Sequence, residues 1–237
     1  MNNYLVIVPT YNEADNIESF LKTVLVLPEH YAVLVVDDGS PDGTAQIVST
    51  LQKKYPQRLF LENRTKKEGL GRAYLHGFKW ALASDYDFVI QMDADFSHNP
   101  VSLKKFIQAF ETGHDLVVGS RYSNGVSVVN WPISRILLSY FASKYVQWIT
   151  RLPIKDPTAG FVGYRRKVLD SLNLDAIQYV GYAFQIEMKY KIWKKGFSWI
   201  EIPIIFRNRT QGQSKMSGSI IWEALIGVLF LPFRKEK

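Results

Sequence analysis

Two aspartates separated by one residue follow an apolar run in the segment VIQMDADFSHNP, residues 89–100. Ionised carboxylates beside a buried strand are costly unless a cation or hydrogen-bond donors meet them. Asp93 and Asp95 leave an extended strand on the same side, because side chains two residues apart share a face. Such a pair suits Mg²⁺ or Mn²⁺ shared with the phosphates of a substrate. The alternative is a pair of turn and cap residues before a helix that begins near Pro100.

A second acidic cluster follows another apolar run in VVDDGSPDGTA, residues 35–45. Asp42 and Gly43 can make a turn, and Asp37 or Asp38 can accept hydrogen bonds from a nucleobase or a ribose. The alternative is a strand-to-helix loop built from turn and N-cap residues. The chain has no G-x-G-x-x-G after its first strand and no G-x-x-x-x-G-K-[ST], which argues against a dinucleotide enzyme and a P-loop NTPase.

Apolar runs and helix patterns alternate through the first half of the chain. Helix patterns cover residues 13–26, 43–55, 69–84 and 100–112, between short runs that predict parallel strands buried on both faces. This alternation predicts a doubly wound α/β sheet, whose ligands bind at the carboxyl ends of its strands. Polar clusters follow four of the runs, so we expect them to form one site. The runs are YLVIVPTY, AVLVVDD, RLFLEN, DFVIQMD and DLVVGSR, and the clusters are residues 10–13, 37–42, 93–98 and 120–122.

The alternation loosens from about residue 130 onward. WPISRILLSYFASKYVQWITR predicts an aromatic-rich helix, and TAGFVGYRR and FSWIEIPIIFRN predict strands. A short apolar helix is expected at Ser219–Pro232, before the final RKEK. Its length of about 20 Å is short of the ~30 Å hydrocarbon core of a bilayer. We find no repeats or linker, and therefore predict one domain over residues 1–237 with a C-terminal helical elaboration.

Composition places the chain among soluble globular proteins. Of 237 residues, 47% are apolar and 22% charged, which argues against a disordered class. Lys and Arg number 29 against 22 acidic residues, and the net charge of +7 suits anionic partners such as a nucleotide, a lipid phosphate or a membrane surface. The absence of cysteine excludes disulfides and thiolate metal sites. MNNYLVIVPTYNE has no basic or long apolar segment, so we expect no signal peptide.

Several motifs together resemble the family 2 inverting glycosyltransferases with a GT-A fold, and among them the dolichol-phosphate (polyprenol-phosphate) mannosyltransferases. The motifs are VPTYNEADNI, VVDDGSPDGT, MDADFSHNP and GSRY, followed by DPTAGFVGYRR, GYAFQIEM and FRNRTQGQSKM. They occur in the family's order over nearly the whole chain. The resemblance implies an α/β GT-A fold with a mostly parallel sheet. It also implies a nucleotide-sugar-binding half, residues 1–125, and an acceptor-binding half, residues 126–237, that ends in an interfacial amphipathic helix.

The resemblance implies transfer of mannose from GDP-mannose to a polyprenyl monophosphate, with inversion and with Mg²⁺ or Mn²⁺ as cofactor. Asp93 and Asp95 would hold the metal. Ser97 would be the third ligand, although its side chain is short and neutral and a water can take that place. Arg209 and Lys215 would close over the diphosphate, or else form a solvated basic loop. The remaining donor-binding residues would be Pro9, Tyr11, Glu13, Asp37, Asp38 and Ala94.

On the acceptor side the resemblance implies that Arg121, Arg135 and Ser139 bind the lipid phosphate. Arg135, Ser139, Ser143 and Gln147 recur every four residues and predict one polar stripe on a helix, although a helix that simply packs on the domain is the alternative. A phosphate monoester has its second pKa near 6, so its oxygen is ionised at pH 7 and needs no strong base. The catalytic residues would be Asp95, Arg121, Asp156, Arg209 and Lys215, with Asp156 expected to orient substrate rather than to act as the base that a hydroxyl acceptor would need.

Four further residues are expected to serve the fold. His98 and His114 are interpreted as cap or surface residues. Gln185 and Glu187 lie on a predicted helix, and either bond internally or support the site.

Two other functions remain open at this stage. One is a UDP-sugar-dependent transferase that acts on a lipid phosphate or a glycan hydroxyl, and the other is a non-catalytic, membrane-associated binder of nucleotide sugars. We expect a cytoplasmic protein peripheral to the inner face of the membrane, with no nucleic-acid partner. Its C-terminal segment would cap the core or lie in the interface, through Trp222, Leu225, Leu229 and Phe230.

Overall fold

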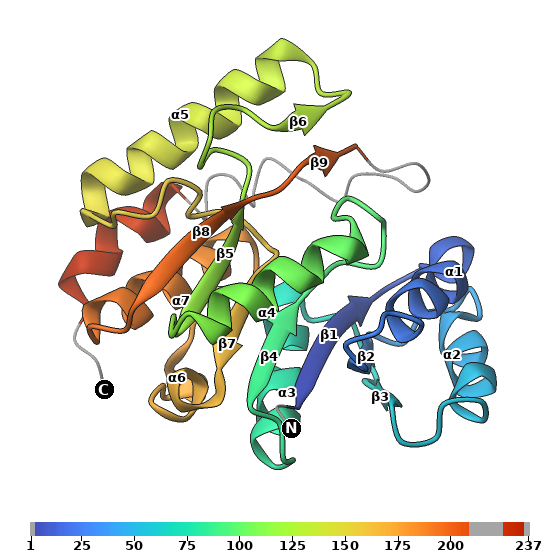
Figure 1. The fold of residues 1–237 in the computed structure, drawn as a ribbon. Helices are drawn as coiled ribbons and strands as arrows, with labels where there is room; N and C mark the ends of the chain where they lie inside the picture. The colour runs from blue at the N-terminus through green and yellow to red at the C-terminus, as the bar shows by residue number, and fades with distance from the viewer. Residues whose placement is uncertain (1–2, 209–224, 235–237) are drawn as a thin grey trace.

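The computed structural model describes residues 3–208 and 225–234, and a seven-stranded sheet crosses it in the order β3-β2-β1-β4-β7-β5-β8 (Figure 1). Strands β6 and β9 pair in parallel as a second, small sheet. The strands of the large sheet are β1 (Tyr4–Thr10), β2 (Ala32–Asp37), β3 (Leu59–Asn63), β4 (Phe88–Gln91), β5 (Leu116–Ser120), β7 (Val162–Arg165) and β8 (Trp199–Pro203), and those of the small sheet are β6 (Val128–Val129) and β9 (Phe206–Arg207).

The large sheet is mostly parallel, as the sequence predicts. Strand β1 pairs in parallel with β2 and β4, β2 with β3, and β5 with β8. Strand β7 is the exception, because it runs antiparallel to both of its neighbours, β4 and β5. The register places Thr10 beside Asp37, so the polar residues that end β1 and β2 are adjacent.

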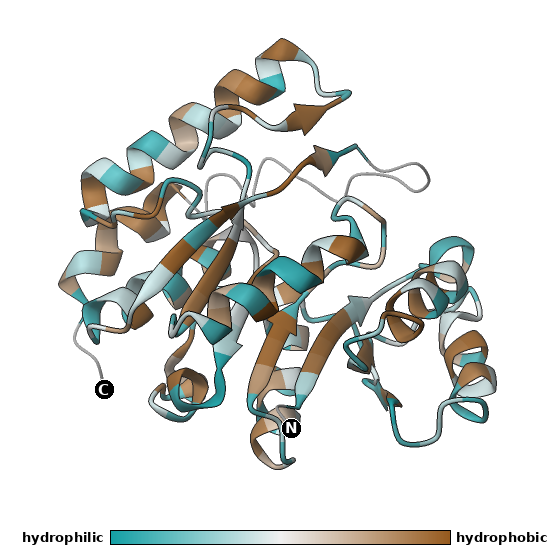
Figure 2. Ribbon diagram, viewed as in Figure 1, coloured by the Kyte–Doolittle hydropathy of each residue, from teal (hydrophilic) through white to brown (hydrophobic). Residues whose placement is uncertain are grey.

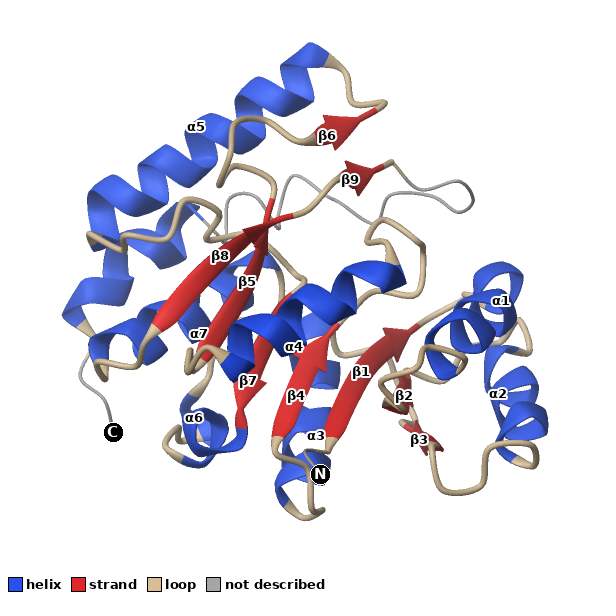
Figure 3. Ribbon diagram, viewed as in Figure 1, coloured by secondary structure: helices blue, strands red, loops and turns tan. Residues whose placement is uncertain are grey.

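The helices flank the sheet in the predicted order (Figure 3). All four patterns predicted in the first half form helices, with ends one to a few residues inside the expected bounds. Residues 225–230 of the predicted C-terminal helix are helical, and residues 219–224 lie outside the described part. The helices are α1 (Ala14–Leu25), α2 (Thr44–Gln52), α3 (Leu70–Leu82), α4 (Leu103–Glu111), α5 (Ile133–Thr150), α6 (Arg166–Asp170) and α7 (Tyr182–Lys194), with short 3-10 turns at η1 (Pro100–Ser102), η2 (Leu174–Ala176) and η3 (Leu231–Phe233).

Two apolar layers bury the sheet on its two faces. Leu5 and Ile7 of β1 pack in one layer with α3 and α7, whereas Val6 and Val8 pack in the other with α1 and α4. Every residue of β2 is buried. Strands covered on both faces need apolar side chains in both directions, which is why β1, β4 and β5 are brown over most of their length in Figure 2.

Helix α5 carries apolar side chains both on the side that packs on the domain and on its outer side. Ser143 and Thr150 of its polar side are buried together with Val146. Its large apolar side chains, among them Phe141 and Trp148, are exposed. The helix nevertheless packs on the domain, with Val146 in the apolar core and Tyr145 and Ile149 against it, so the packed-helix alternative stays open beside the polar stripe. No helix in the described ranges has the length and apolar character to cross a bilayer.

Candidate active site

The ends of β1 and β2 form a hydrogen-bonded acidic corner. Asp37 is 1% exposed. It accepts bonds from the Thr10 hydroxyl at 2.7 Å and from the Ser40 amide and hydroxyl at 2.8 and 2.6 Å. Asp42 accepts from the Ala14 amide and the Thr44 amide and hydroxyl, which ties the beginnings of α1 and α2 together. Both aspartates therefore stabilise loops, and Asp38 beside them is also buried, at 5% exposure.

Asp38 has a basic partner that sequence reasoning missed. The Arg64 guanidinium donates to it at 2.7 Å, and burial raises the pKa of Asp38 although the charge of Arg64 opposes that rise. Arg64 directly follows β3, the one early strand after which no polar cluster was singled out. Nearby, the Lys67 ammonium lies 4.4 Å from the centre of the Tyr11 ring. An aromatic ring and a salt-bridged carboxylate thus lie at the ends of neighbouring strands. The other predicted donor residues lie near them, with Pro9 and Glu13 half-buried and Ala94 buried.

The Asp93 and Asp95 pair follows β4 at the same edge. Asp93 accepts a hydrogen bond from the Tyr74 hydroxyl at 3.1 Å, and Asp95 accepts one from the Ser97 amide at 3.0 Å. Asp95 and Ser97 are buried, whereas Asp93 is half-buried. In the described ranges, no cluster of three or more acidic or histidine side chains could hold a metal. Two carboxylates suit a hard cation that completes its shell with phosphate and water, so these residues fit the predicted ion.

Arg121 and Asp156 form a buried ion pair beyond the end of β5. Asp156 accepts from the Arg121 backbone amide at 2.9 Å, from Nε at 2.8 Å and from Nη2 at 2.6 Å. The carboxylate is fully buried. Burial alone would raise the pKa of Asp156, but the charge and hydrogen bonds of Arg121 hold it below its usual value. Asp156 is therefore an ionised group that orients Arg121.

Lys189 supports the loop that carries Asp156. Its ammonium is buried and donates to the carbonyl oxygens of Pro157 at 3.2 Å and Ala159 at 2.7 Å. Burial lowers the pKa of Lys189 to about 7, although the charges of Asp156 and Glu201 oppose this shift. The sequence gives no signal for this lysine, because it lies on a helix among other lysines.

The depressed pKa of Lys189 predicts a pH-dependent stability. Between about pH 7 and pH 10 the unfolded chain keeps the Lys189 proton and the folded chain has lost it. Stability then rises with pH, by up to about 1.4 kcal/mol per pH unit from this group. Chemical denaturation of the native chain and of Lys189→Met at pH 7, 8 and 9 measures the effect. We expect the free energy of unfolding of the native chain to rise with pH relative to that of Lys189→Met. A difference between the two chains that stays constant with pH would contradict the lowered pKa of Lys189.

An aromatic cluster connects Arg121 to α5. The Arg121 guanidinium lies 5.7 Å from the Trp131 ring, and that of Arg135 lies 4.1 Å from the same ring. The Tyr122 hydroxyl donates to Ser139 Oγ at 2.8 Å. Arg121 and Arg135 therefore share one tryptophan, and Tyr122, whose ring lies 5.3 Å from the Arg121 guanidinium, connects Ser139 to them. Among the described residues Arg135 has no acidic partner, and its guanidinium donates only to the Asn208 carboxamide oxygen at 3.3 Å.

Buried polar atoms without a protein partner, counted among the described residues, include several near this cluster. His98 Nδ1 and Trp131 Nε1 are two of them, and both rings contact Phe206. Gln185 has neither carboxamide atom paired, and its neighbour Phe184 stacks on Tyr74, the partner of Asp93. Buried polar groups are rarely left unpaired, so each of these atoms needs a partner beyond the described residues.

The four residues expected to serve the fold, which are His98, His114, Gln185 and Glu187, have different surroundings in the structure. His98 is buried between Phe161 and Phe206, so a surface position is wrong, and burial lowers its pKa to about 4. His114 bonds to the Ala109 carbonyl oxygen after α4. Glu187 bonds internally, to two backbone amides and to Lys191, whereas Gln185 does not. Arg209 and Lys215 lie outside the described residues.

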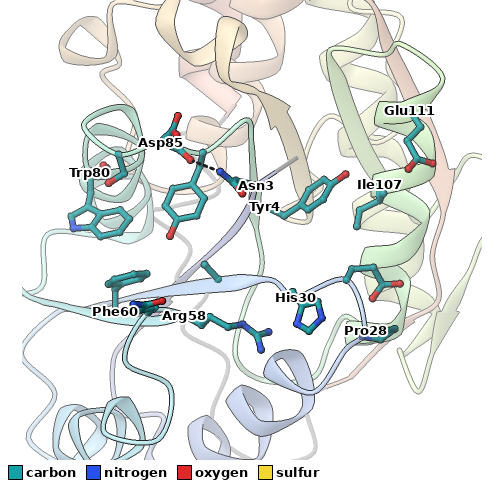
Figure 4. Close-up of a pocket in the computed structure, with 15 residues that line it drawn as sticks. Asn3, Tyr4, Pro28, His30, Arg58, Phe60, Trp80, Asp85, Ile107 and Glu111 are labelled. Atoms are coloured by element: carbon teal, nitrogen blue, oxygen red, sulfur yellow. Dashed lines mark hydrogen bonds between the residues drawn. The ribbon is translucent and has the colours of Figure 1, made fainter. Parts of the chain in front are cut away.

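A separate hollow of about 850 Å³ lies at the opposite, amino-terminal edge of the large sheet (Figure 4). Its polar groups are largely used by the fold. Arg58 donates to the carbonyl oxygens of Leu25 and Tyr31, and the Asn3 side chain donates to the Asp85 carbonyl. It contains none of the predicted site residues, so the carboxyl edge remains the candidate site.

An acidic pair and a basic, aromatic cluster at one edge of a mostly parallel sheet fit a glycosyltransferase of the GT-A type. Residues 5–172 match the model of glycosyl transferase family 2. The chain is 45% identical over 224 residues to the polyprenol monophosphomannose synthase of Mycolicibacterium smegmatis, which covers 94% of this chain and 84% of the relative. It is 42% identical over 224 residues to the undecaprenyl-phosphate mannosyltransferase of Micrococcus luteus, covering 94% and 91%. The chain belongs to glycosyl transferase family 2.

Solved structures support the GT-A architecture. Glucosyl-3-phosphoglycerate synthase from Mycobacterium tuberculosis, in complex with Mn²⁺, UDP and glucosyl-3-phosphoglycerate, superposes with a TM-score of 0.73 at 18% identity, over 97% of this chain and 79% of that one. The same enzyme with Mg²⁺ and UDP gives a TM-score of 0.72 at 18% identity, over 97% and 78%. Likeness at this identity concerns the fold, and the mostly parallel GT-A prediction is confirmed.

Proposed function

We propose that this glycosyltransferase moves mannose from GDP-mannose to a polyprenyl monophosphate and inverts the anomeric carbon. The observation that carries the proposal is the cluster of Arg121, Trp131, Arg135 and Ser139 at the carboxyl edge, where Arg135 has no acidic partner among the described residues. A cationic fork beside a hydroxyl suits a phosphate monoester. The names of two relatives, each more than 40% identical, support a polyprenyl acceptor and mannose.

The donor would lie across the ends of β1, β2 and β4. Tyr11 and Asp38 would hold guanosine, and Pro9, Glu13 and Ala94 would shape its slot. Asp93 and Asp95 would hold Mg²⁺ or Mn²⁺, with Ser97 or a water beside them, and the ion would neutralise charge on the leaving diphosphate. We retain Arg209 and Lys215 as residues that close over the diphosphate. In this division residues 1–125 would supply most of the donor site and residues 126–237 most of the acceptor site, while Arg121, Arg209 and Lys215 would act across the boundary.

The acceptor phosphate would lie against Arg135 and Ser139, with Arg121 behind them. Arg121 is bonded to Asp156, so the pair adds little net charge and its main contribution is a rigid orientation. The phosphate oxygen is ionised at pH 7, and positioning it behind the anomeric carbon is the principal task. Asp156 is fully buried and engaged by Arg121, so we infer that it positions Arg121 instead of removing a proton.

The first test supplies purified protein with radiolabelled GDP-mannose, Mn²⁺ or Mg²⁺ and a polyprenyl phosphate in detergent, and measures label in the organic phase. Metal-dependent lipid label with GDP-mannose, and none with UDP-glucose, is the expected result. Label from a UDP-sugar instead would move the chain to the UDP-dependent alternative. Folded protein that binds donor but transfers nothing across the donor and acceptor panel would support the binder.

Removing the Arg135 side chain should weaken the acceptor selectively. A hydrogen bond to a charged group is worth about 1.5–3 kcal/mol, so Arg135→Ala should raise KM for the polyprenyl phosphate by about 10- to 100-fold while KM for GDP-mannose stays within about threefold. The KM of Arg135→Lys for the polyprenyl phosphate should lie between that of the native chain and that of Arg135→Ala. Lys53→Ala, an exposed cation at the end of α2, is the control, and an equal rise in both KM values would place Arg135 outside the acceptor site.

The acceptor also bears on where the protein works. A polyprenyl tail stays in lipid while its phosphate enters the site, so the enzyme has to reach a bilayer surface. We propose that it is a cytoplasmic protein peripheral to the inner face of the membrane. Val228 and Leu231 of the C-terminal segment are buried, whereas Leu229 and Phe230 are exposed, which supports both capping of the core and an interfacial role. Trp222 lies outside the described residues.

A further inference from the structure

The Tyr74 hydroxyl of α3 contacts the acidic pair from the protein interior. It donates to Asp93 Oδ1 at 3.1 Å, across 19 positions of the sequence. Tyr74 is fully buried, whereas Asp93 is half-buried. The first carboxylate of the pair is therefore held by a separate element of the fold.

The two carboxylates of the pair are held in different ways. Asp95 accepts from the backbone amide of Ser97 at 3.0 Å, within its own loop, whereas Asp93 accepts from a side chain of α3. A bond to one oxygen restricts the plane of a carboxylate, and with it the direction of the second oxygen. A small divalent ion requires oxygens in fixed directions, at about 2.1 Å for Mg²⁺. The orientation of Asp93 thus depends on where α3 places a hydroxyl group.

Aromatic packing fixes the position of this hydroxyl. The Tyr74 ring lies nearly parallel to the ring of Phe184 in α7, with 3° between the planes and 6.1 Å between the centroids. Phe78, one turn further along α3, lies 6.3 Å from Tyr74 at 24°. All three rings are fully buried. Rings packed at the density of a protein core have little freedom to rotate, so the phenol oxygen has a defined place.

Close helix packing at two glycines sets the position of α3 itself. A Cβ at Gly71 would lie 2.9 Å from Phe184 Cγ, and a Cβ at Gly77 would lie 2.6 Å from Ile7 Cγ2 of β1. Both distances are shorter than a van der Waals contact. Gly71 and Gly77 are each three residues from Tyr74, so the three share one face of the helix. The contacts with α7 and β1 therefore determine where Tyr74 stands.

The hydroxyl of Tyr74 adds nothing to this apolar packing. A phenylalanine ring would fill the same space, and a buried hydroxyl costs free energy unless it is paired. Tyr164 is a matched comparison, because it is also fully buried in the same apolar layer. Its hydroxyl donates to the Gln91 carboxamide oxygen at 2.6 Å, instead of to a carboxylate of the pair. The bond from Tyr74 is thus the one of the two that acts on Asp93.

We propose that Tyr74 is a positioning residue whose hydroxyl orients Asp93 for the divalent ion on the donor diphosphate. Groups that orient a metal ligand typically contribute about 10- to 100-fold in metal affinity. Tyr74 would touch neither the ion nor the substrate, since it is fully buried. The inference rests on the proposed function in one respect, because that function assigns the ion to Asp93 and Asp95.

Nucleotide binding with and without the ion tests the role of the hydroxyl. GDP is titrated by calorimetry into the native chain, Tyr74→Phe and Tyr164→Phe, with Mn²⁺ and without it. Tyr74→Phe should weaken GDP binding in Mn²⁺ by about tenfold or more and leave binding without Mn²⁺ unchanged. Tyr164→Phe should bind as the native chain does under both conditions, although it also loses a buried hydrogen bond. An equal loss with and without Mn²⁺ in Tyr74→Phe, or the same loss in Tyr164→Phe, would overturn the inference.

A metal titration of transfer separates this inference from the proposed function. Tyr74→Phe should need about tenfold more Mn²⁺ for half of its maximal rate, while kcat at saturating Mn²⁺ stays within about threefold of the native value. A native chain that transfers no mannose, but whose GDP binding shows the Tyr74→Phe loss, would overturn the function and leave Tyr74 assigned. Transfer by the native chain, with equal Mn²⁺ dependence in Tyr74→Phe, would overturn the inference and leave the function. UDP is titrated in parallel, and a chain that binds UDP in place of GDP would overturn the donor alone, because the same comparison of variants then applies with UDP.

Discussion

Asp95→Ala should reduce mannosyl transfer by about a thousandfold or more. Asp95 is buried. Asp93 is the second carboxylate of the pair that would hold the ion. With one carboxylate left, the divalent ion loses a protein ligand, and the charge that develops on the leaving diphosphate loses part of its stabilisation. A loss of about 4 kcal/mol of transition-state stabilisation corresponds to about a thousandfold in rate.

The measurement is kcat at saturating donor together with a titration of Mn²⁺ and Mg²⁺. Asp95→Ala should need far more metal for whatever activity remains, and its thermal stability without metal should stay close to that of the native chain. Asp175→Ala, an exposed carboxylate paired with Lys79, is the matched control and should behave as the native chain. Unchanged metal-dependent turnover in Asp95→Ala would show that the pair serves only as turn and cap residues.

Asp156→Asn should destabilise the fold and disable the acceptor site together. The amide keeps the shape of the carboxylate, but one of its two oxygens becomes a donor that faces the Arg121 guanidinium. The Arg121 charge is then buried without compensation, and breaking a buried pair in this way costs about 3–5 kcal/mol. Denaturant unfolding should show a loss of that size, and KM for the polyprenyl phosphate should rise in the protein that remains folded.

Replacing both partners separates stability from function. Arg121→Met with Asp156→Leu removes both charges, so it should recover much of the lost stability without recovering transfer. Asp115→Asn is the matched single control, because Asp115 is also buried and ion-paired, with Lys167, but precedes β5 at the opposite edge. It should lower stability and leave the acceptor KM unchanged. If Asp156→Asn remains stable and loses only a pH-dependent step in kcat, Asp156 is a general base.

The sequence was most informative where one physical rule decides the structure. Parallel strands buried on both faces must be apolar throughout, so β1, β2, β4 and β5 could be located, and the polar residues that follow them had to meet at one edge. The antiparallel direction of β7 could not be predicted, because a buried strand of either direction has the same apolar pattern. The resemblance, and not the pattern, indicated Arg121, Arg135 and Ser139 as one group.

The less predictable features depend on contacts between distant segments. The Arg64 bond to Asp38 joins residues that are 26 positions apart, and the Lys189 bonds reach back 30 and 32 positions. Neither Lys189 nor Arg64 has a local sequence feature that signals such a contact. The orientation of α5 was also open, since a polar stripe and an apolar stripe on one helix do not reveal which of them faces the protein. Only the packing of Ser143 and Val146 decides it.

In the proposed function, strand β7 would separate the two substrates. It lies between β4, which carries the acidic pair, and β5, which carries Arg121. Neighbouring strands are about 4.8 Å apart, so two strand steps hold the donor and acceptor residues roughly 10 Å apart. Because β7 runs in the opposite direction, the loop that carries Asp156 enters between them. Backbone pairing sets the spacing of β4 and β5, so side chains that would choose the sugar or the lipid could change without moving one strand relative to the other.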